Sequence, residues 1–166
     1  MATVATFGIA LLVLTTIIHY EVLRLLTAGL ATLRHPVRAK LIVIIFGAFL
    51  AHIVEIFLYA VAFYVLVRYV GAGALGDSGP PSLTLCFYFS AETYTSLGYG
   101  DVVPHGDLRL LAGLEALNGL LLIGWSASYT YIAMERFWND GGKAGSMAFA
   151  GAKSDESRPR HRAKRS

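Results

Sequence analysis

The sequence has few charged residues and a single cysteine. Charged residues make up 15% of the chain, whereas soluble domains carry about 25%. This shortage argues against an ordinary soluble domain and indicates a protein embedded in a membrane. The lone cysteine, Cys86, excludes a disulfide within the chain, and we expect it to be a small buried apolar residue.

Lysine and arginine are missing from the whole stretch between Val70 and Asp107. Elsewhere they are clustered: four lie between residues 24 and 40, and seven of the 14 lie in the last 24 positions. Basic residues mark the cytoplasmic side of a membrane protein. We therefore expect the N-terminus and residues 70–107 outside, and the 27–40 segment and the C-terminus in the cytoplasm.

Three apolar runs are candidates for transmembrane helices. Residues 41–67 are interrupted only by His52 and Glu55, and as a helix they would be roughly 40 Å long, enough to cross a bilayer core of about 30 Å. Residues 108–133 form a second run and residues 2–26 a third. The third run also resembles a secretory signal peptide, but no basic residue precedes it, so we expect a retained helix.

A shorter apolar segment, residues 83–94, lies within the stretch that lacks basic residues. Pro80 and Pro81 prevent a helix from continuing upstream, and Ser82 is a typical N-cap. A helix of this length measures roughly 18 Å, too short to cross a bilayer, so it must be re-entrant. Its C-terminal end would point at the membrane centre, where its negative partial charge favours a cation.

The residues after this helix, 95–101, have the sequence Thr-Ser-Leu-Gly-Tyr-Gly-Asp. Gly98 and Gly100 allow positive φ angles, so that successive carbonyls can all face one side. Rings of four such loops form the filter of potassium channels, where carbonyl oxygens replace the hydration shell of the ion. Gly-Tyr-Gly also occurs in ordinary turns, but its position directly after a re-entrant helix favours an ion-binding loop.

Residues 88–104 resemble, without gaps, the pore loop of bacterial tetrameric potassium channels. The order of span, pore helix, filter and span extends the resemblance over residues 41–135. The resemblance implies that K⁺ is the only metal, bound at the filter with no other cofactor, and that the ion-binding residues are Ser96, Leu97, Gly98, Tyr99 and Gly100. The family usually has Thr-Val where this chain has Ser96-Leu97, and this departure leaves a less selective cation channel as the alternative.

The same resemblance assigns four residues to the support of the filter. Glu92 and Asp101 correspond to a carboxyl pair that, in some members of the family, lies behind the filter and shares a proton or a water. Tyr88 corresponds to an aromatic that hydrogen-bonds the residue at the Asp101 position, and Thr95 begins the filter segment. The alternatives are a solvated Glu92 on the pore helix and a Tyr88 that only packs.

Five residues inside the expected spans are candidates for gating. His52 and Glu55 lie on one helix face, and Glu115 lies about two turns into the last span. Such groups are costly in a membrane and have either a proton-sensitive or a hydrogen-bonded structural role; we favour the structural one. A metal site needs more than these two ligands, so we do not expect one at His52 and Glu55. Gly119 and Gly124 could be hinges or points of close helix packing.

We therefore expect an all-α membrane protein with three transmembrane helices and a re-entrant pore helix and filter loop between the second and the third. One chain supplies a single filter segment, so the expected assembly is a tetramer. The expected parts are an N-terminal helix with a basic loop (1–40), a pore domain (41–137) and a basic, disordered cytoplasmic tail (138–166). Within the pore domain we expect an outer helix at 41–70, a pore helix at 82–94, a filter at 95–101 and an inner helix at 108–135.

The predicted function is passive, potassium-selective conduction by a homotetramer, and the resemblance implies a bacterial inner membrane. A non-conducting accessory subunit is a further alternative. We do not expect an enzyme, because the sequence offers no nucleophile–base spacing and no phosphate-binding loop. No helix carries basic residues at every third position, which excludes an arginine-ladder voltage sensor. The basic cluster 158–165 either attracts anionic lipids or only fixes topology, and we do not expect it to bind nucleic acid.

Overall fold

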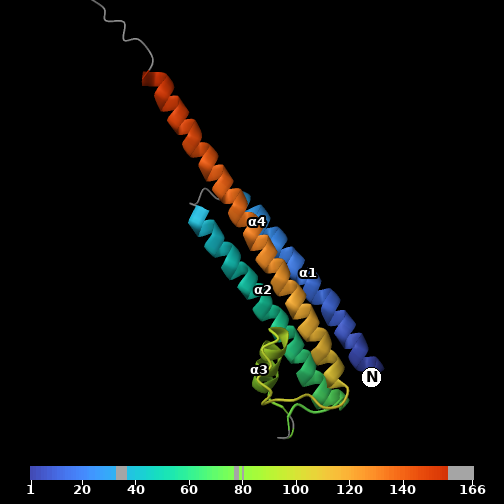
Figure 1. Ribbon diagram of the computed structural model, residues 1–166. Coiled ribbons are helices and arrows are strands. Elements are labelled where there is room, and N and C mark those ends of the chain that lie inside the picture. The colour runs from blue at the N-terminus through green and yellow to red at the C-terminus, as the bar shows by residue number, and fades with distance from the viewer. Residues whose placement is uncertain (33–36, 77–78, 80, 157–166) are drawn as a thin grey trace, which may run out of the picture.

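Three long helices run side by side, and a short helix lies at one end of them (Figure 1). The computed structural model describes residues 1–32, 37–76, 79 and 81–156. The elements in chain order are α1 (Ala2–Thr32), α2 (Val37–Val65), the π-helical turn η1 (Leu66–Val70), α3 (Leu83–Tyr94) and α4 (Leu108–Glu156). α1 packs against both α2 and α4, and α3 packs against the same two helices.

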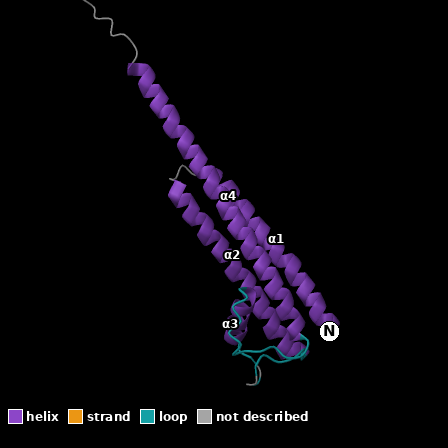
Figure 2. Cartoon of the chain, in the orientation of Figure 1, coloured by secondary structure: helices purple, strands orange, loops and turns teal. Residues whose placement is uncertain are grey.

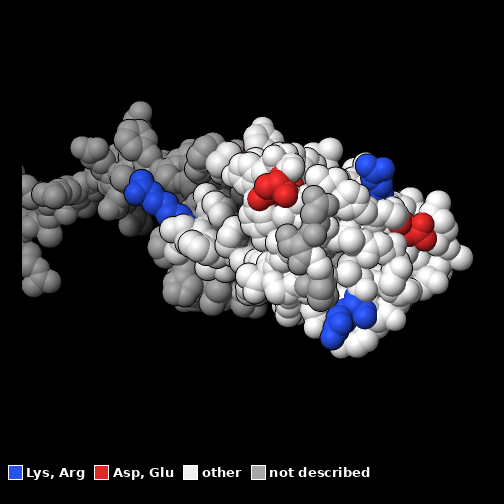
Figure 3. All heavy atoms as spheres, turned by 90° about the horizontal axis from the view of Figure 1, so that it is seen from below, with Lys and Arg blue, Asp and Glu red and all other residues white. Residues whose placement is uncertain are grey.

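The three long helices confirm the predicted all-α membrane fold. The segments Ala2–Gly29, Arg38–Val70 and Leu108–Arg136 are each long and apolar enough to cross a membrane. Large apolar side chains cover their outer faces, among them Phe46 and Leu121, which are 68% and 63% exposed in the single chain. Charged side chains are sparse at the end of the molecule where α3 lies (Figure 3). The apolar outer faces of the three long helices therefore suit lipid or neighbouring chains rather than water.

The short helix α3 begins where the sequence predicts. The N–H of Leu85 donates to the Ser82 hydroxyl oxygen at 3.1 Å, so Ser82 is the N-cap. Loops gather around α3 at a single end of the bundle (Figure 2). Phe89 of α3 meets Phe63 of α2 edge to face, with ring centroids 5.0 Å apart. This contact fixes α3 beside α2.

The last helix is longer than expected. The sequence predicts an inner helix that ends at residue 135 and a disordered tail from residue 138, whereas α4 continues to Glu156. No proline lies between Leu108 and Glu156, and each further residue of a nucleated helix adds a hydrogen bond. The basic cluster 158–165 lies outside the described residues. α1 ends at Thr32 and α2 begins at Val37, each a few residues beyond its predicted limit.

Candidate ion-conduction site

The backbone after α3 alternates between two conformations. Ser96, Gly98 and Gly100 have positive φ angles of 57°, 54° and 81°. Glycine adopts such angles without a steric penalty, whereas a serine there is strained by about 1–3 kcal/mol. No atom lies within 4 Å of a Cβ added at Gly98 or Gly100, so in the single chain the backbone angle, and not crowding, requires glycine.

Four successive N–H groups of this segment point at the end of α3. They donate as follows: Ser96 to the Thr93 carbonyl (3.0 Å), Leu97 and Gly98 to the Glu92 carbonyl (2.8 and 3.3 Å), and Tyr99 to the Glu92 carboxyl (3.1 Å). In a trans peptide the carbonyl lies opposite the N–H, and the described chain has no cis peptide. The carbonyls of residues 95–98 therefore face away from α3.

These outward carbonyls lie on the surface of the single chain. Residues 95–100 are exposed, and the side chains of Leu97 and Tyr99 are 58% and 70% exposed. Among the described residues, no hydrogen bond engages these carbonyl oxygens, and a row of such oxygens can bind a cation or water. The arrangement is suited to ion coordination once further copies surround the same axis.

Two side chains hold different parts of the loop at residues 95–101, the predicted filter. Glu92 is 4% exposed and its carboxyl accepts the Tyr99 N–H, so it is not the solvated residue of the alternative interpretation. The Tyr88 hydroxyl donates to Asp101 at 2.9 Å, and this hydrogen bond raises the pKa of Tyr88 to about 12. Asp101 also accepts the N–H of Val102 at 3.1 Å. Within the described residues no hydrogen bond joins Glu92 to Asp101.

The other predicted residues mostly stabilise the helices around the filter. The Thr95 hydroxyl donates to the Ala91 carbonyl at 2.7 Å and so closes the end of α3. A Cβ added at Gly119 would lie 2.1 Å from the Tyr94 carbonyl oxygen, so α4 can approach α3 only because this position is glycine. Gly124 has no atom within 4 Å of such a Cβ. Gly119 thus serves close packing, and this chain places no such constraint on Gly124.

Glu115 of α4 is fully buried and faces α3. The Ser90 hydroxyl oxygen lies 2.8 Å from the Ile56 carbonyl oxygen and also contacts one carboxyl oxygen of Glu115. Ser90 has one proton and the carbonyl has none, so two simultaneous hydrogen bonds require a proton from Glu115. The other carboxyl oxygen has no hydrogen-bond partner in the described part of the chain. A neutral carboxylic acid with a structural role fits this environment.

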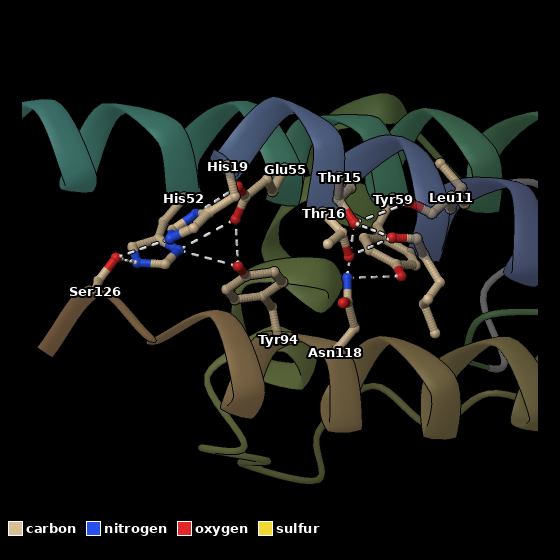
Figure 4. Close-up of polar contacts among 11 residues, drawn as sticks. Leu11, Thr15, Thr16, His19, His52, Glu55, Tyr59, Tyr94, Asn118 and Ser126 are labelled. Atoms are coloured by element: carbon tan, nitrogen blue, oxygen red, sulfur yellow. Dashed lines mark hydrogen bonds and ion pairs between the residues drawn. The ribbon is translucent and has the colours of Figure 1, made fainter. Parts of the chain in front are cut away.

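His52 and Glu55 belong to a larger polar cluster that the sequence did not reveal (Figure 4). His19 of α1 brings its Nδ1 to 2.9 Å from one carboxyl oxygen of Glu55, and His52 Nδ1 lies 3.2 Å from the other. The Tyr94 hydroxyl donates to Glu55 and lies 3.0 Å from His52 Nδ1. The Ser126 hydroxyl oxygen lies 3.1 Å from the Nε2 of both histidines. Four helices therefore meet at this cluster.

A second polar contact joins α1 to the same bundle. The Asn118 amide of α4 donates to the hydroxyl oxygens of Thr15, at 2.8 Å, and Tyr59, at 3.2 Å. Sequence reasoning missed these residues together with His19. The available signal was the same as for His52, a polar residue in an apolar helix, but the sequence alone does not indicate which helices face one another.

The family model described as ion channel matches residues 41–136, more than half of the chain. The chain therefore belongs to the ion channel family, as an integral membrane protein and a channel rather than an enzyme. It is similar to the inward rectifier potassium channel Kirbac3.1 of Paramagnetospirillum magnetotacticum, with 31% identity over 97 residues, which cover 58% of this chain and 33% of the relative. The matched part is thus a third of that relative's length. No solved structure matches the chain.

Proposed function

We propose that four copies of this chain form a potassium-selective channel, in which dehydrated K⁺ passes through rings of backbone carbonyls. The observation that carries this proposal is the run of N–H groups in residues 96–99 that bond to α3 and Glu92. It turns the carbonyls of residues 95–98 to the opposite side, where four strands around an axis supply rings of four oxygens. The similarity to an inward rectifier potassium channel supports K⁺ as the ion.

Conduction by this arrangement involves no covalent step and no cofactor beyond the permeant ion. K⁺ exchanges its water shell for carbonyl oxygens, and ions in neighbouring rings displace one another along the axis. Ser96 adds a hydroxyl oxygen to the carbonyl oxygens of the strand. The C-terminal end of α3 carries a negative partial charge that favours a cation nearby.

The proposed orientation follows from charge. The ammonium group of Met1 contacts the Asp107 carboxylate, so the N-terminus and the filter share one end of the bundle. The positive-inside rule assigns that end to the outside of a bacterial inner membrane, with the C-terminus in the cytoplasm and its basic residues near anionic lipid.

Flux through liposomes that contain the purified protein tests this proposal. We expect potassium-driven flux that is much smaller when sodium replaces potassium. Gly98→Ala is expected to abolish the flux, because alanine is strained at a φ of 54°. Gly113→Ala is the matched control, since it lies on α4 with no atom within 4 Å of an added Cβ, and it is expected to conduct. Cross-linking of the same samples reports whether four chains assemble.

The Ser96-Leu97 pair supports a second candidate, a cation channel of lower selectivity. Serine lacks the methyl group that stiffens threonine at this position. Equal sodium and potassium fluxes would favour this candidate, and Ser96→Thr with Leu97→Val is then expected to raise the preference for potassium. Absence of flux from assembled tetramers would contradict passive conduction. Absence of both flux and tetramers would favour an accessory subunit.

A further inference from the structure

We propose that His19, His52, Glu55 and Tyr94 form a binding site for a divalent transition metal ion in the core of the bundle. Its side-chain donors are distinct from the filter carbonyls, although Tyr94 directly precedes the filter, and the site does not depend on the proposed potassium conduction. It would join three helices, α1, α2 and α3, through a single ion. The sequence indicates only His52 and Glu55 as ligands, and the structure supplies two further ones.

The donor atoms are already gathered. One ligand atom from each of His19, His52 and Glu55 lies within 4.8 Å of the others. The two Nδ1 atoms lie 2.9 and 3.2 Å from the separate carboxyl oxygens of Glu55. Ligand bonds of about 2.0–2.2 Å around tetrahedral zinc place neighbouring donors roughly 3.3–3.6 Å apart. Small movements of these side chains would therefore bring the donors to the spacing that the ion requires.

Tyr94 provides a fourth donor. Its hydroxyl oxygen lies 3.0 Å from His52 Nδ1 and contacts the same carboxyl oxygen of Glu55. Two imidazole nitrogens with two oxygens form a set that suits zinc, copper or nickel, whereas the alkaline-earth ions prefer oxygen ligands alone. With four protein ligands the site would be closed, as structural zinc sites are.

Ser126 orients both histidines for this role. Its hydroxyl oxygen lies 3.1 Å from the Nε2 of His19 and 3.1 Å from the Nε2 of His52. When both Nδ1 atoms bind a metal, both Nε2 atoms carry a proton, and the two lone pairs of the Ser126 oxygen can accept both. If instead two neutral histidines donate from Nδ1 to Glu55, both Nε2 atoms need a proton from Ser126, which has only one.

The charge of the cluster also favours a bound cation. The Glu55 side chain is fully buried, and in the described part of the chain its ion-pair partners are the two histidines. The nearest basic side chain of α1 after His19, Arg24, pairs with Glu21 at 2.6 Å. A buried carboxylate is costly unless a positive charge compensates it, and a divalent ion supplies that charge.

Metal binding by the full-length, tag-free protein in detergent tests the proposal directly. We expect about one Zn²⁺ or Co²⁺ ion per chain, and an absorption spectrum typical of tetrahedral rather than octahedral Co²⁺. His19→Gln and His52→Gln are expected to bind Co²⁺ at least tenfold more weakly. His105→Gln, which removes an exposed histidine outside the cluster, is the matched control and is expected to bind normally.

Two further measurements keep the test independent of folding defects. Ser126→Ala retains all four ligands and is expected to lower the affinity for Co²⁺ about 10–100-fold through the loss of ligand orientation. Zn²⁺ is expected to raise the thermal unfolding temperature of the wild type but not of His19→Gln. An octahedral Co²⁺ spectrum, or unchanged binding in His19→Gln, would overturn the proposal and leave a hydrogen-bond network only. Neither measurement requires ion flux, so failure of conduction would not affect the result.

Discussion

Glu92 holds the loop that we propose as the filter through both its backbone and its side chain. The carbonyl accepts the N–H groups of Leu97 and Gly98, and the carboxyl accepts that of Tyr99. Only the last bond depends on the identity of the side chain. Substitution of Glu92 therefore removes one anchor of the filter and leaves the backbone anchors in place.

We expect Glu92→Ala to destabilise the filter conformation by about 1–3 kcal/mol, because the Tyr99 N–H loses its acceptor. Potassium flux in liposomes should fall while the protein still assembles. Glu92→Gln keeps an oxygen that can accept the same bond and is the matched control, with flux near that of the wild type. Undiminished flux from Glu92→Ala would show that this anchor is dispensable.

The Tyr88 contact gives a prediction about alkaline pH. The hydrogen bond to Asp101 raises the pKa of Tyr88 to about 12 from an ordinary value of about 10. The unfolded chain then loses this proton first, so the contribution to stability is complete below about pH 10 and is lost as the pH rises through about 12. The thermal unfolding temperature should therefore decline as the pH rises through this range, and the decline should be smaller in Tyr88→Phe.

Tyr69→Phe, at an exposed tyrosine of η1, serves as the control for this measurement. It should reproduce the alkaline decline of the wild type. If the unfolding temperature of Tyr88→Phe declines as much as those of the wild type and Tyr69→Phe, the Tyr88–Asp101 contact does not cause the loss of stability at alkaline pH.

Sequence reasoning at the residue scale succeeded where contacts are local. The Tyr88–Asp101 bond and the Ser82 cap join residues within 13 positions of each other. It failed for His19 and Glu55, whose side chains meet across 36 positions. Bonds between residues close in sequence follow from helix and loop geometry. Bonds between distant residues depend instead on how two long helices are rotated about their axes, and a uniformly apolar sequence does not specify this rotation.

At the scale of elements, one glycine sets the distance between α4 and α3. An added Cβ at Gly119 would lie 2.1 Å from the backbone oxygen of Tyr94, an atom that cannot rotate away. The carbonyl belongs to the last residue of α3, directly before the filter. The position of the filter relative to α4 therefore depends on this contact.

Gly119→Ala is expected to push α4 away from α3 and to destabilise the protein by about 1–3 kcal/mol, as overpacking does. The thermal unfolding temperature should fall and the flux should change with it. Gly113→Ala on the same helix removes a glycine without a clash and is expected to be neutral or slightly stabilising. Equal unfolding temperatures for the two variants would refute the packing role of Gly119.

The limits of the elements were predicted with uneven success. The start of α3 follows from Pro80, Pro81 and Ser82, and α4 starts at the predicted Leu108. The end of α4 was missed because composition, and not a helix-stopping residue, was used to place it. Glycine, alanine and basic residues are compatible with a helix when a long apolar helix precedes them.

At the scale of the whole molecule, α1 is integrated into the pore domain. The family model begins at residue 41, so α1 lies outside the matched region. Val4 and Leu11 are nevertheless buried in the common core, and Thr15 and His19 bond to α4 and α2. The sequence predicted the helix but not this role, since the exposed face of α1 is also apolar and does not distinguish the buried side.

A chain that lacks residues 1–35 is expected to be less stable than the full chain. Interhelical hydrogen bonds in membranes contribute about 0.6 kcal/mol each, and the truncated chain also loses the apolar contacts of α1. Its thermal unfolding temperature and its yield of assembled protein should both fall. As a control, Ile9→Leu on the exposed face of α1 should leave both unchanged. A truncated chain as stable as the full one would mean that α1 does not stabilise the pore domain.

The contacts of Thr15 and His19 have a consequence for biogenesis. Hydrocarbon itself offers no hydrogen-bond partners, so the contacts of Thr15 with Asn118 and of His19 with Ser126 do not rely on the peptide link between α1 and α2. Two polypeptides divided at that link, synthesised together in one cell, should recognise each other in the bilayer and restore the bundle. The first helix would then act as a separable docking peptide that the rest of the protein selects by its polar side chains.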